Sequence, residues 1–136
     1  MKFEEALNEG KVIKITPNLE RANSLYKSST KTLLFAENNS LTSENSGVLL
    51  SNYYESLIEF LHSIAYKKGF KILDHMSFTY FIEEILFSKS FSVLFDKYRK
   101  IRNGVIYYGK EIDINTTKQA IKDIKEMINF LKKNFK

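Results

Sequence analysis

The chain has 136 residues, 43% of them hydrophobic, and 21 lysines and arginines against 16 acidic residues give it a net charge of +5. This length fits one domain with a single core, spanning residues 1–136, and the composition is globular, which excludes a disordered chain. The absence of cysteine excludes disulfides, thiolate chemistry and cysteine-bound zinc. No apolar run approaches the ~20 residues that cross a bilayer, and the first residues do not resemble a signal peptide, so we expect a cytoplasmic protein without membrane contact.

Helical patterns dominate the first third of the chain. Residues 2–9 predict a short helix that Gly10 ends, and residues 12–15 predict an extended segment. Pro17 suits a helix start because its missing N–H would be unpaired there in any case. From Pro17 a helix is expected to run to about Ala36, since small and apolar side chains recur every three or four positions.

The middle of the chain predicts two further helices. Thr42 or Ser43 is expected to cap a second long helix, which Gly69 ends. Asp74 is expected to cap a third helix, and a break follows near residues 88–90. We find no alternation of apolar and polar residues long enough to predict a strand.

The last third predicts two long helices. The first is expected to span residues 91–108 and to stop at Gly109, and Asp113 or Asn115 is expected to cap the second. The predicted fold is therefore an all-α, up-and-down bundle of four long helices and a shorter one, with a short N-terminal helix.

Basic residues gather on the helix predicted for residues 91–108. Core packing does not explain a cluster of this kind, and a localised basic patch is typical of polyanion binding. A solvated helix face is the alternative explanation. Gly104 lies within this helix, where a glycine often permits close approach of a ligand or another backbone. The candidate nucleic-acid-binding residues are Lys97, Arg99, Lys100, Arg102 and Lys110.

One side of this helix combines an arginine, an amide and a phenol. Arg102 lies at the edge of the apolar stripe, and Asn103 and Tyr107, four residues apart, lie together on the next face. The alternative is structural: Arg102 packs its stem on the core edge and pairs with a carboxylate such as Glu55 or Glu59, while Tyr107 and Tyr108 are core residues whose hydroxyls reach water.

The two histidines point to no metal site. His62 follows Glu59 at the spacing used in helical di-iron proteins, but no matching carboxylates occur on other helices. His75 follows Asp74 in the first turn of the third predicted helix. We therefore expect no metal and no cofactor.

Several segments together resemble the HEPN family, and more narrowly the small archaeal HEPN-domain proteins. These are the Tyr-Tyr-Glu sequence of residues 53–55, the segment 68–71 (KGFK), the segment 95–103 (FDKYRKIRN) and the segment 107–109 (YYG). The resemblance implies a helical bundle that homodimerises, and a metal-independent endoribonuclease of a toxin–antitoxin or defence system. It also implies a possible small nucleotidyltransferase partner that acts as the antitoxin.

The catalytic pattern of the HEPN family is an arginine, usually followed by a polar residue, and then a histidine after a short spacer. Arg102 and Asn103 match the first two positions, but the window for the histidine covers Tyr107, Tyr108 and Gly109. RNA cleavage through the 2′-hydroxyl needs a group that transfers a proton near pH 7, and a phenol does this poorly. We therefore expect binding of RNA or of a phosphate ligand, with endoribonuclease activity by Arg102, Asn103 and Tyr107 as the alternative.

Overall fold

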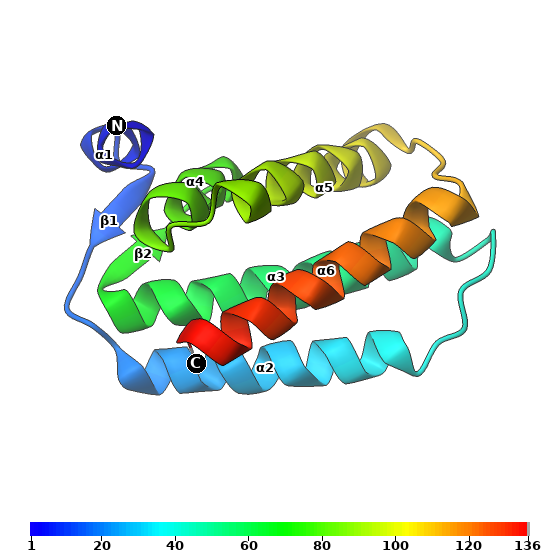
Figure 1. Cartoon of the computed structure of the whole chain (residues 1–136), viewed down its shortest axis with the longest axis horizontal. Coiled ribbons are helices and arrows are strands. Elements are labelled where there is room, and N and C mark those ends of the chain that lie inside the picture. The colour runs from blue at the N-terminus through cyan, green and yellow to red at the C-terminus, as the bar shows by residue number, and fades with distance from the viewer. Residues whose placement is uncertain (136) are drawn as a thin grey trace.

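The computed structural model describes residues 1–135, and these residues are mainly helical (Figure 1). Four helices of 19 to 23 residues run in alternating directions along the molecule, with shorter elements at one end. The prediction of a mainly helical protein is confirmed. The elements, in chain order, are α1 (Lys2–Asn8), β1 (Val12–Lys14), α2 (Leu19–Glu37), α3 (Ser46–Lys68), β2 (Phe70–Ile72), α4 (His75–Tyr80), the π-helix η1 (Phe81–Ile85), α5 (Lys89–Tyr108) and α6 (Ile114–Phe135).

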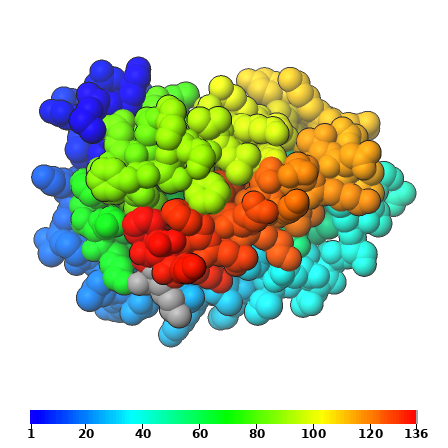
Figure 2. Space-filling model, in the orientation of Figure 1, coloured from blue at the N-terminus to red at the C-terminus, as the bar shows by residue number. Residues whose placement is uncertain are grey.

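The central helix is α3, which packs against α2, α5, α6 and β2. Its residues Tyr54, Leu57 and Leu61 are completely buried, and a helix that is apolar around most of its circumference belongs in a core. On the face seen in Figure 2, α6 lies between α5 and α2 and covers α3. The long helices therefore form one core around α3.

Small residues allow α2 and α3 to approach closely. Ser29 and Ser56 each donate a hydrogen bond from Oγ to the other's carbonyl oxygen, at 2.8 Å in both directions. One further contact of this kind joins Ser63 Oγ to the carbonyl oxygen of Ala22, at 2.6 Å. These hydrogen bonds satisfy the buried hydroxyl groups, so the two helices can pack directly against each other.

A two-stranded sheet at one end of the bundle was not predicted. Strands β1 and β2 pair antiparallel, with Val12 opposite Ile72 and Lys14 opposite Phe70. The extended segment expected at residues 12–15 is confirmed as β1, but three-residue strands are too short to show alternation, so β2 was missed. Gly69 joins α3 to β2 at φ +91°, and a Cβ there would lie 2.9 Å from the carbonyl oxygen of Ile15. The pairing therefore requires a glycine at this position.

The start of α3 differs from the prediction. The helix begins at Ser46, so the prediction that Thr42 or Ser43 caps it was wrong. Thr42 and Asn45 instead bond each other: Thr42 N donates to Asn45 Oδ1 at 2.8 Å, and Asn45 N donates to Thr42 Oγ1 at 3.2 Å. These reciprocal bonds hold a turn before the helix, because each polar side chain satisfies a backbone N–H locally.

The remaining helix ends agree with the prediction or lie close to it. Asp74 caps α4 by accepting a hydrogen bond from Ser77 N at 3.1 Å, as predicted. Of the two caps proposed for the last helix, Asp113 is the one used, since its Oδ1 accepts from Thr116 N at 2.9 Å. The third helix continues as η1, and α5 begins at Lys89, two residues earlier than predicted.

Candidate functional site

The C-terminal half of α5 and the start of α4 border an open cleft of about 470 Å³, which we call the Arg102 cleft. Four of its residues come from residues 73–76, at the junction of β2 and α4, and four come from α5. Three of the residues singled out in the sequence, Arg102, Asn103 and Tyr107, are therefore brought together here. The lining residues are Leu73, Asp74, His75, Met76, Arg99, Arg102, Asn103 and Tyr107.

Arg102 is half-buried and forms no ion pair with the part of the chain that the structure describes. Its Cζ lies 5.2 Å from the centre of the Tyr54 ring, a cation–π contact with the central helix. Its Nε is buried without a hydrogen-bond partner among the described residues, and no carboxylate of residues 1–135 forms an ion pair with it. A partly desolvated charge left in this state favours the binding of an anion.

The ion pair considered for Arg102 with Glu55 or Glu59 does not form. Glu59 accepts hydrogen bonds from Ser28 and from Thr32 Oγ1, the latter at 2.6 Å, so its carboxylate is used on the α2 side of α3. Glu55 is exposed. Although the residue as a whole is exposed, protein packed around its carboxyl group, followed by the neighbouring Glu59, raises the pKa of Glu55, while the positive charge of Arg102 lowers it. Arg102 is therefore close enough to affect Glu55 but is not neutralised by it.

Arg99 lies one turn earlier on α5, and its guanidinium already binds a carboxylate of the protein. Its Nε and Nη2 donate to Asp96 Oδ1 at 2.9 and 2.7 Å, and Lys100 Nζ lies 3.1 Å from Asp96 Oδ2. Thr79 Oγ1 of α4 also donates to this carboxylate. Burial opposes the ionisation of Asp96, but the bonds from Arg99 and Lys100 outweigh it and hold its pKa below the usual value. Thr79 thus ties α4 to α5 through Asp96, and Arg99 and Lys100 hold this carboxylate from within α5.

His75 also lines the cleft, although the sequence analysis placed it only in a helix turn. Its Nδ1 lies 3.0 Å from the hydroxyl oxygen of Tyr54. Burial, followed by the charge of Arg102, lowers the pKa of His75, whereas Asp74 raises it and Arg99 lowers it further. The only sequence signal was a capped histidine after a long helix, and nothing in its spacing connects it to a residue 27 positions later.

The rim of the cleft carries exposed apolar and aromatic groups. Tyr107 is 69% exposed, Leu73 is 53% exposed and Met76 is 44% exposed. Asn103 is half-buried beside Arg102. The expectation that Tyr107 or Tyr108 packs in the core was wrong, since both rings are exposed at the C-terminal end of α5.

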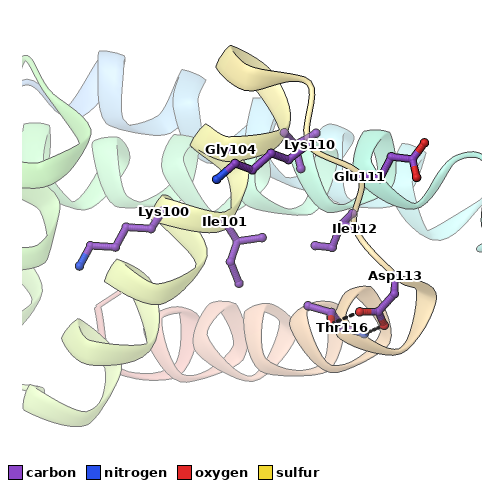
Figure 3. Close-up of a pocket in the computed structure, with 9 residues that line it drawn as sticks. Lys100, Ile101, Gly104, Lys110, Glu111, Ile112, Asp113 and Thr116 are labelled. Carbon is purple, nitrogen blue, oxygen red and sulfur yellow. Dashed lines mark hydrogen bonds between the residues drawn. The ribbon is translucent and has the colours of Figure 1, made fainter.

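Another side of α5 borders a second hollow, of about 370 Å³, which we call the Lys110 cleft (Figure 3). The loop after α5 turns back so that Lys110 lies along Gly104, where an added Cβ would lie 3.3 Å from Lys110 Cδ. Lys100, Lys110, Glu111 and Asp113 all line this hollow, but Figure 3 shows the Glu111 carboxylate pointing away from both lysines. The close approach inferred at Gly104 is thus made by the chain's own lysine.

The predicted basic residues therefore do not form one patch. Arg99 and Arg102 line the Arg102 cleft, whereas Lys100 and Lys110 line the Lys110 cleft. Lys97 lies on the exposed surface with its Nζ 5.3 Å from the ring centre of Tyr98. Of the predicted basic residues, Arg102 is the arginine that forms no ion pair within residues 1–135, and it lines the Arg102 cleft.

The structure offers no metal site of the type considered for His62. Burial lowers the pKa of His62 to about 4, and its ring packs edge-on against Phe78 at 4.7 Å between centres. Among residues 1–135, no group of three or more histidine and acidic side chains is placed to hold a metal ion.

Within the same range, no helix combines the length and the apolar character needed to cross a membrane.

Comparisons with protein-family models, with curated proteins and with solved structures found no match to this chain. The functional assignment therefore depends on the geometry of the Arg102 cleft and on the sequence resemblance.

Proposed function

We propose that this chain is a HEPN-like helical protein that binds single-stranded RNA through a backbone phosphate in the Arg102 cleft. The observation that carries the proposal is the half-buried guanidinium of Arg102, which lines an open cleft without an ion pair from the described residues. A planar guanidinium donates two parallel hydrogen bonds to a phosphate, and a phosphate would supply the missing negative charge.

The neighbours of Arg102 suit RNA. Asn103 carries an amide that both donates and accepts, which matches base edges and the 2′-hydroxyl. The exposed ring of Tyr107 lies on the cleft rim, where an unstacked base can stack on it. Single-stranded RNA offers accessible bases as well as phosphates, and this combination favours it over a duplex.

The other basic residues take different parts in this proposal. Lys97, Lys100 and Lys110 are exposed and raise the local positive potential that attracts a polyanion. Arg99 lies at the bottom of the same cleft, but its guanidinium already binds Asp96. We therefore assign the direct phosphate contact to Arg102.

The test is RNA binding by charge-matched variants. Arg102→Gln and Lys118→Gln each remove one positive charge, but Lys118 lies on the exposed surface of α6. With a fluorescent ten-residue oligouridylate, we expect Arg102→Gln to weaken binding about tenfold or more, since hydrogen bonds to charged groups contribute roughly 1.5–3 kcal/mol. Lys118→Gln is expected to change it by less than about threefold. Equal losses in the two variants would show non-specific attraction and contradict the proposal.

A second candidate is metal-independent RNA cleavage, the activity implied by the HEPN resemblance. The observation that favours it is the imidazole of His75 in the same cleft as Arg102 and Tyr107. Cleavage of a structured RNA in EDTA, lost in Tyr107→Phe or in His75→Ala, would support it. An intact RNA after prolonged incubation with the wild type would remove this candidate and leave the binding function.

The resemblance also carries expectations about assembly. We propose a homodimer, and a toxin–antitoxin role with a small nucleotidyltransferase as partner. Light scattering at micromolar concentration tests the dimer, and a monomeric mass contradicts it. A neighbouring reading frame for a small nucleotidyltransferase would support the paired system.

A further inference from the structure

Three separate helices converge on one polar cluster in the Arg102 cleft. Tyr54 of α3 lies under the guanidinium of Arg102 from α5, and its hydroxyl oxygen lies 3.0 Å from Nδ1 of His75 in α4. The rings of Tyr54 and His75 are 5.7 Å apart between centres. Tyr54 therefore contacts both the arginine and the histidine that line the cleft.

The surroundings of Tyr54 determine which group donates the hydrogen bond. Tyr54 is completely buried, and burial raises its pKa well above the usual value, so the hydroxyl keeps its proton. A buried O–H needs an acceptor, and among the described residues its hydrogen-bond partner is His75 Nδ1. Tyr54 therefore donates to Nδ1, and the neutral imidazole carries its own proton on Nε2, at the ring edge away from Tyr54.

We infer that Tyr54 and His75 form a second phosphate-binding element of the Arg102 cleft, in which Tyr54 positions His75 to donate from Nε2–H to the phosphate that Arg102 binds. This inference rests on the proposed function, because it needs a phosphate in that cleft. It names a binding residue, His75, and a positioning residue, Tyr54, that the arginine-centred sequence pattern does not contain. The phosphate is thereby held by α4 and α5 together.

The same hydrogen bond argues against His75 as a general base. With its proton on Nε2, the imidazole has no lone pair facing away from Tyr54 to accept the proton of a ribose 2′-hydroxyl. The Tyr54–His75 pair therefore favours binding over cleavage at neutral pH.

A binding role makes RNA affinity depend on pH. The charged and titratable groups around His75 are Asp74 before it, Arg99 and Arg102 on α5, and Tyr54 and His62 on α3. A bound phosphate adds a negative charge beside the ring and so raises the pKa of His75 above that of the free protein. By linkage, affinity is expected to rise as the pH falls through the pKa of the bound form, and to level off below that of the free form.

The chain contains two histidines, which makes a nuclear magnetic resonance test direct. Long-range proton–nitrogen spectra report the tautomer of each ring, and His62, packed against Phe78, is an internal control. We expect the Nε2–H tautomer for free His75. Saturation with a ten-residue oligouridylate carrying a 5′-hydroxyl is expected to raise the pKa of His75 and to leave His62 unchanged.

Inorganic phosphate, titrated in parallel, separates the two sources of the anion. A shift of His75 with both probes supports a phosphate element that serves RNA. A shift with inorganic phosphate alone supports the element and overturns its use for RNA.

Variants of His75 and Tyr54 provide the binding test. His75→Gln places an amide N–H near the position of Nε2, so we expect neutral-pH affinity within about threefold of the wild type and no pH dependence. His75→Ala is expected to lose roughly three- to tenfold, the effect of one hydrogen bond. Tyr54→Phe keeps the ring under Arg102 and removes the hydroxyl, so the free protein is expected to gain the Nδ1–H tautomer.

The outcomes separate this inference from the proposed function. Oligouridylate binding that depends on Arg102 but moves neither the pKa nor the tautomer of His75 overturns the inference and leaves the proposed function. Loss of affinity in His75→Ala without pH dependence in the wild type also overturns it. The absence of Arg102-dependent binding with either probe removes both.

Discussion

Two arginines one turn apart on α5 have opposite surroundings. Arg99 is 8% exposed and gives two hydrogen bonds to Asp96, which Lys100 and Thr79 also contact. Arg102 lies over the Tyr54 ring, and its Nε has no partner among the described residues. Arg99 holds the Asp96 carboxylate that also bonds Thr79 of α4, whereas Arg102 contacts Tyr54 and forms no ion pair with a carboxylate of residues 1–135.

This difference shows how the same side chain serves stability in one place and recognition in another. Removing Arg99 takes two charge-assisted hydrogen bonds from the half-buried Asp96 carboxylate, which keeps only Lys100 and Thr79 among the described residues. A half-buried charge with no partner costs stability and persists where function needs it. The predictions below change one of these two environments at a time.

Removing Arg99 is expected to have the largest effect. In Arg99→Gln, the half-buried Asp96 loses two hydrogen bonds but keeps Lys100 and Thr79, so we expect the free energy of unfolding to fall by about 1–2 kcal/mol. Arg102→Met removes the charge that lacks an ion pair but also the cation–π contact with Tyr54, so the two effects oppose each other and the unfolding free energy is expected to change by less than about 1 kcal/mol. Urea unfolding measures both, and a greater loss in Arg102→Met would show that we have assigned the two arginines in reverse.

The Asp96 network also predicts a dependence on pH. Because its pKa is depressed in the folded state, Asp96 stabilises the fold above the usual carboxyl pKa, and this contribution is lost as the pH falls through the folded value. Asp96→Asn is expected to be less stable than the wild type at pH 6, and the difference is expected to narrow at acid pH. Glu111→Gln, in the exposed loop after α5, is the control and is expected to stay within about 0.5 kcal/mol. A constant difference for Asp96→Asn across pH would contradict the network.

Two helical glycines test the Lys110 side of α5. Gly104→Ala meets only the flexible Lys110 side chain, at 3.3 Å, so the gain in helix propensity is expected to stabilise the fold by up to about 1 kcal/mol. The matched control is Gly47→Ala in α3, whose new Cβ would lie 3.0 Å from Val105 Cγ1 and is expected to destabilise it. RNA affinity should be unchanged in Gly104→Ala, and a loss would move the binding site to the Lys110 cleft.

The smallest predicted effect concerns Glu55, a carboxylate whose pKa is raised by the protein packed around it and lowered in part by the charge of Arg102. Glu55 is exposed and feels the charge of Arg102 without pairing with it. Glu55→Gln removes a negative charge that competes with a phosphate, so we expect RNA affinity to rise about two- to threefold. Glu111→Gln has the same change in net charge and is expected to show less. Equal increases would mean that only net charge matters.

Much of the fold could be predicted because the apolar pattern of a long helix repeats over several turns. The stripes of α5 and α6 recur over five turns, and Asp74, Gly109 and Asp113 provide chemically specific boundaries. The three-residue strands carry too few positions for a pattern. The start of α3 was misplaced because Thr42 and Asn45 bond each other before the helix, and that choice depends on both side chains at once.

The candidate site could be predicted only along one helix. Helical spacing placed Asn103 and Tyr107, four residues apart, on one face next to Arg102, and all three line the Arg102 cleft. Helical spacing could not show that the Asp96 carboxylate would bind Arg99 and not Arg102. Nor could it bring in His75, because contact between α4 and α5 arises only when both pack on Tyr54 of the central helix.

The central claim is that the guanidinium of Arg102 meets a phosphate. The chain has three arginines, Arg21, Arg99 and Arg102, so their side-chain Nε–H signals can be assigned individually by nuclear magnetic resonance. During titration with a ten-residue oligouridylate, we predict a saturable shift of the Arg102 signal that exceeds any shift of Arg99 in the same cleft, while the signal of Arg21 on α2 stays in place. Saturable RNA binding that leaves the Arg102 signal unmoved would contradict the account.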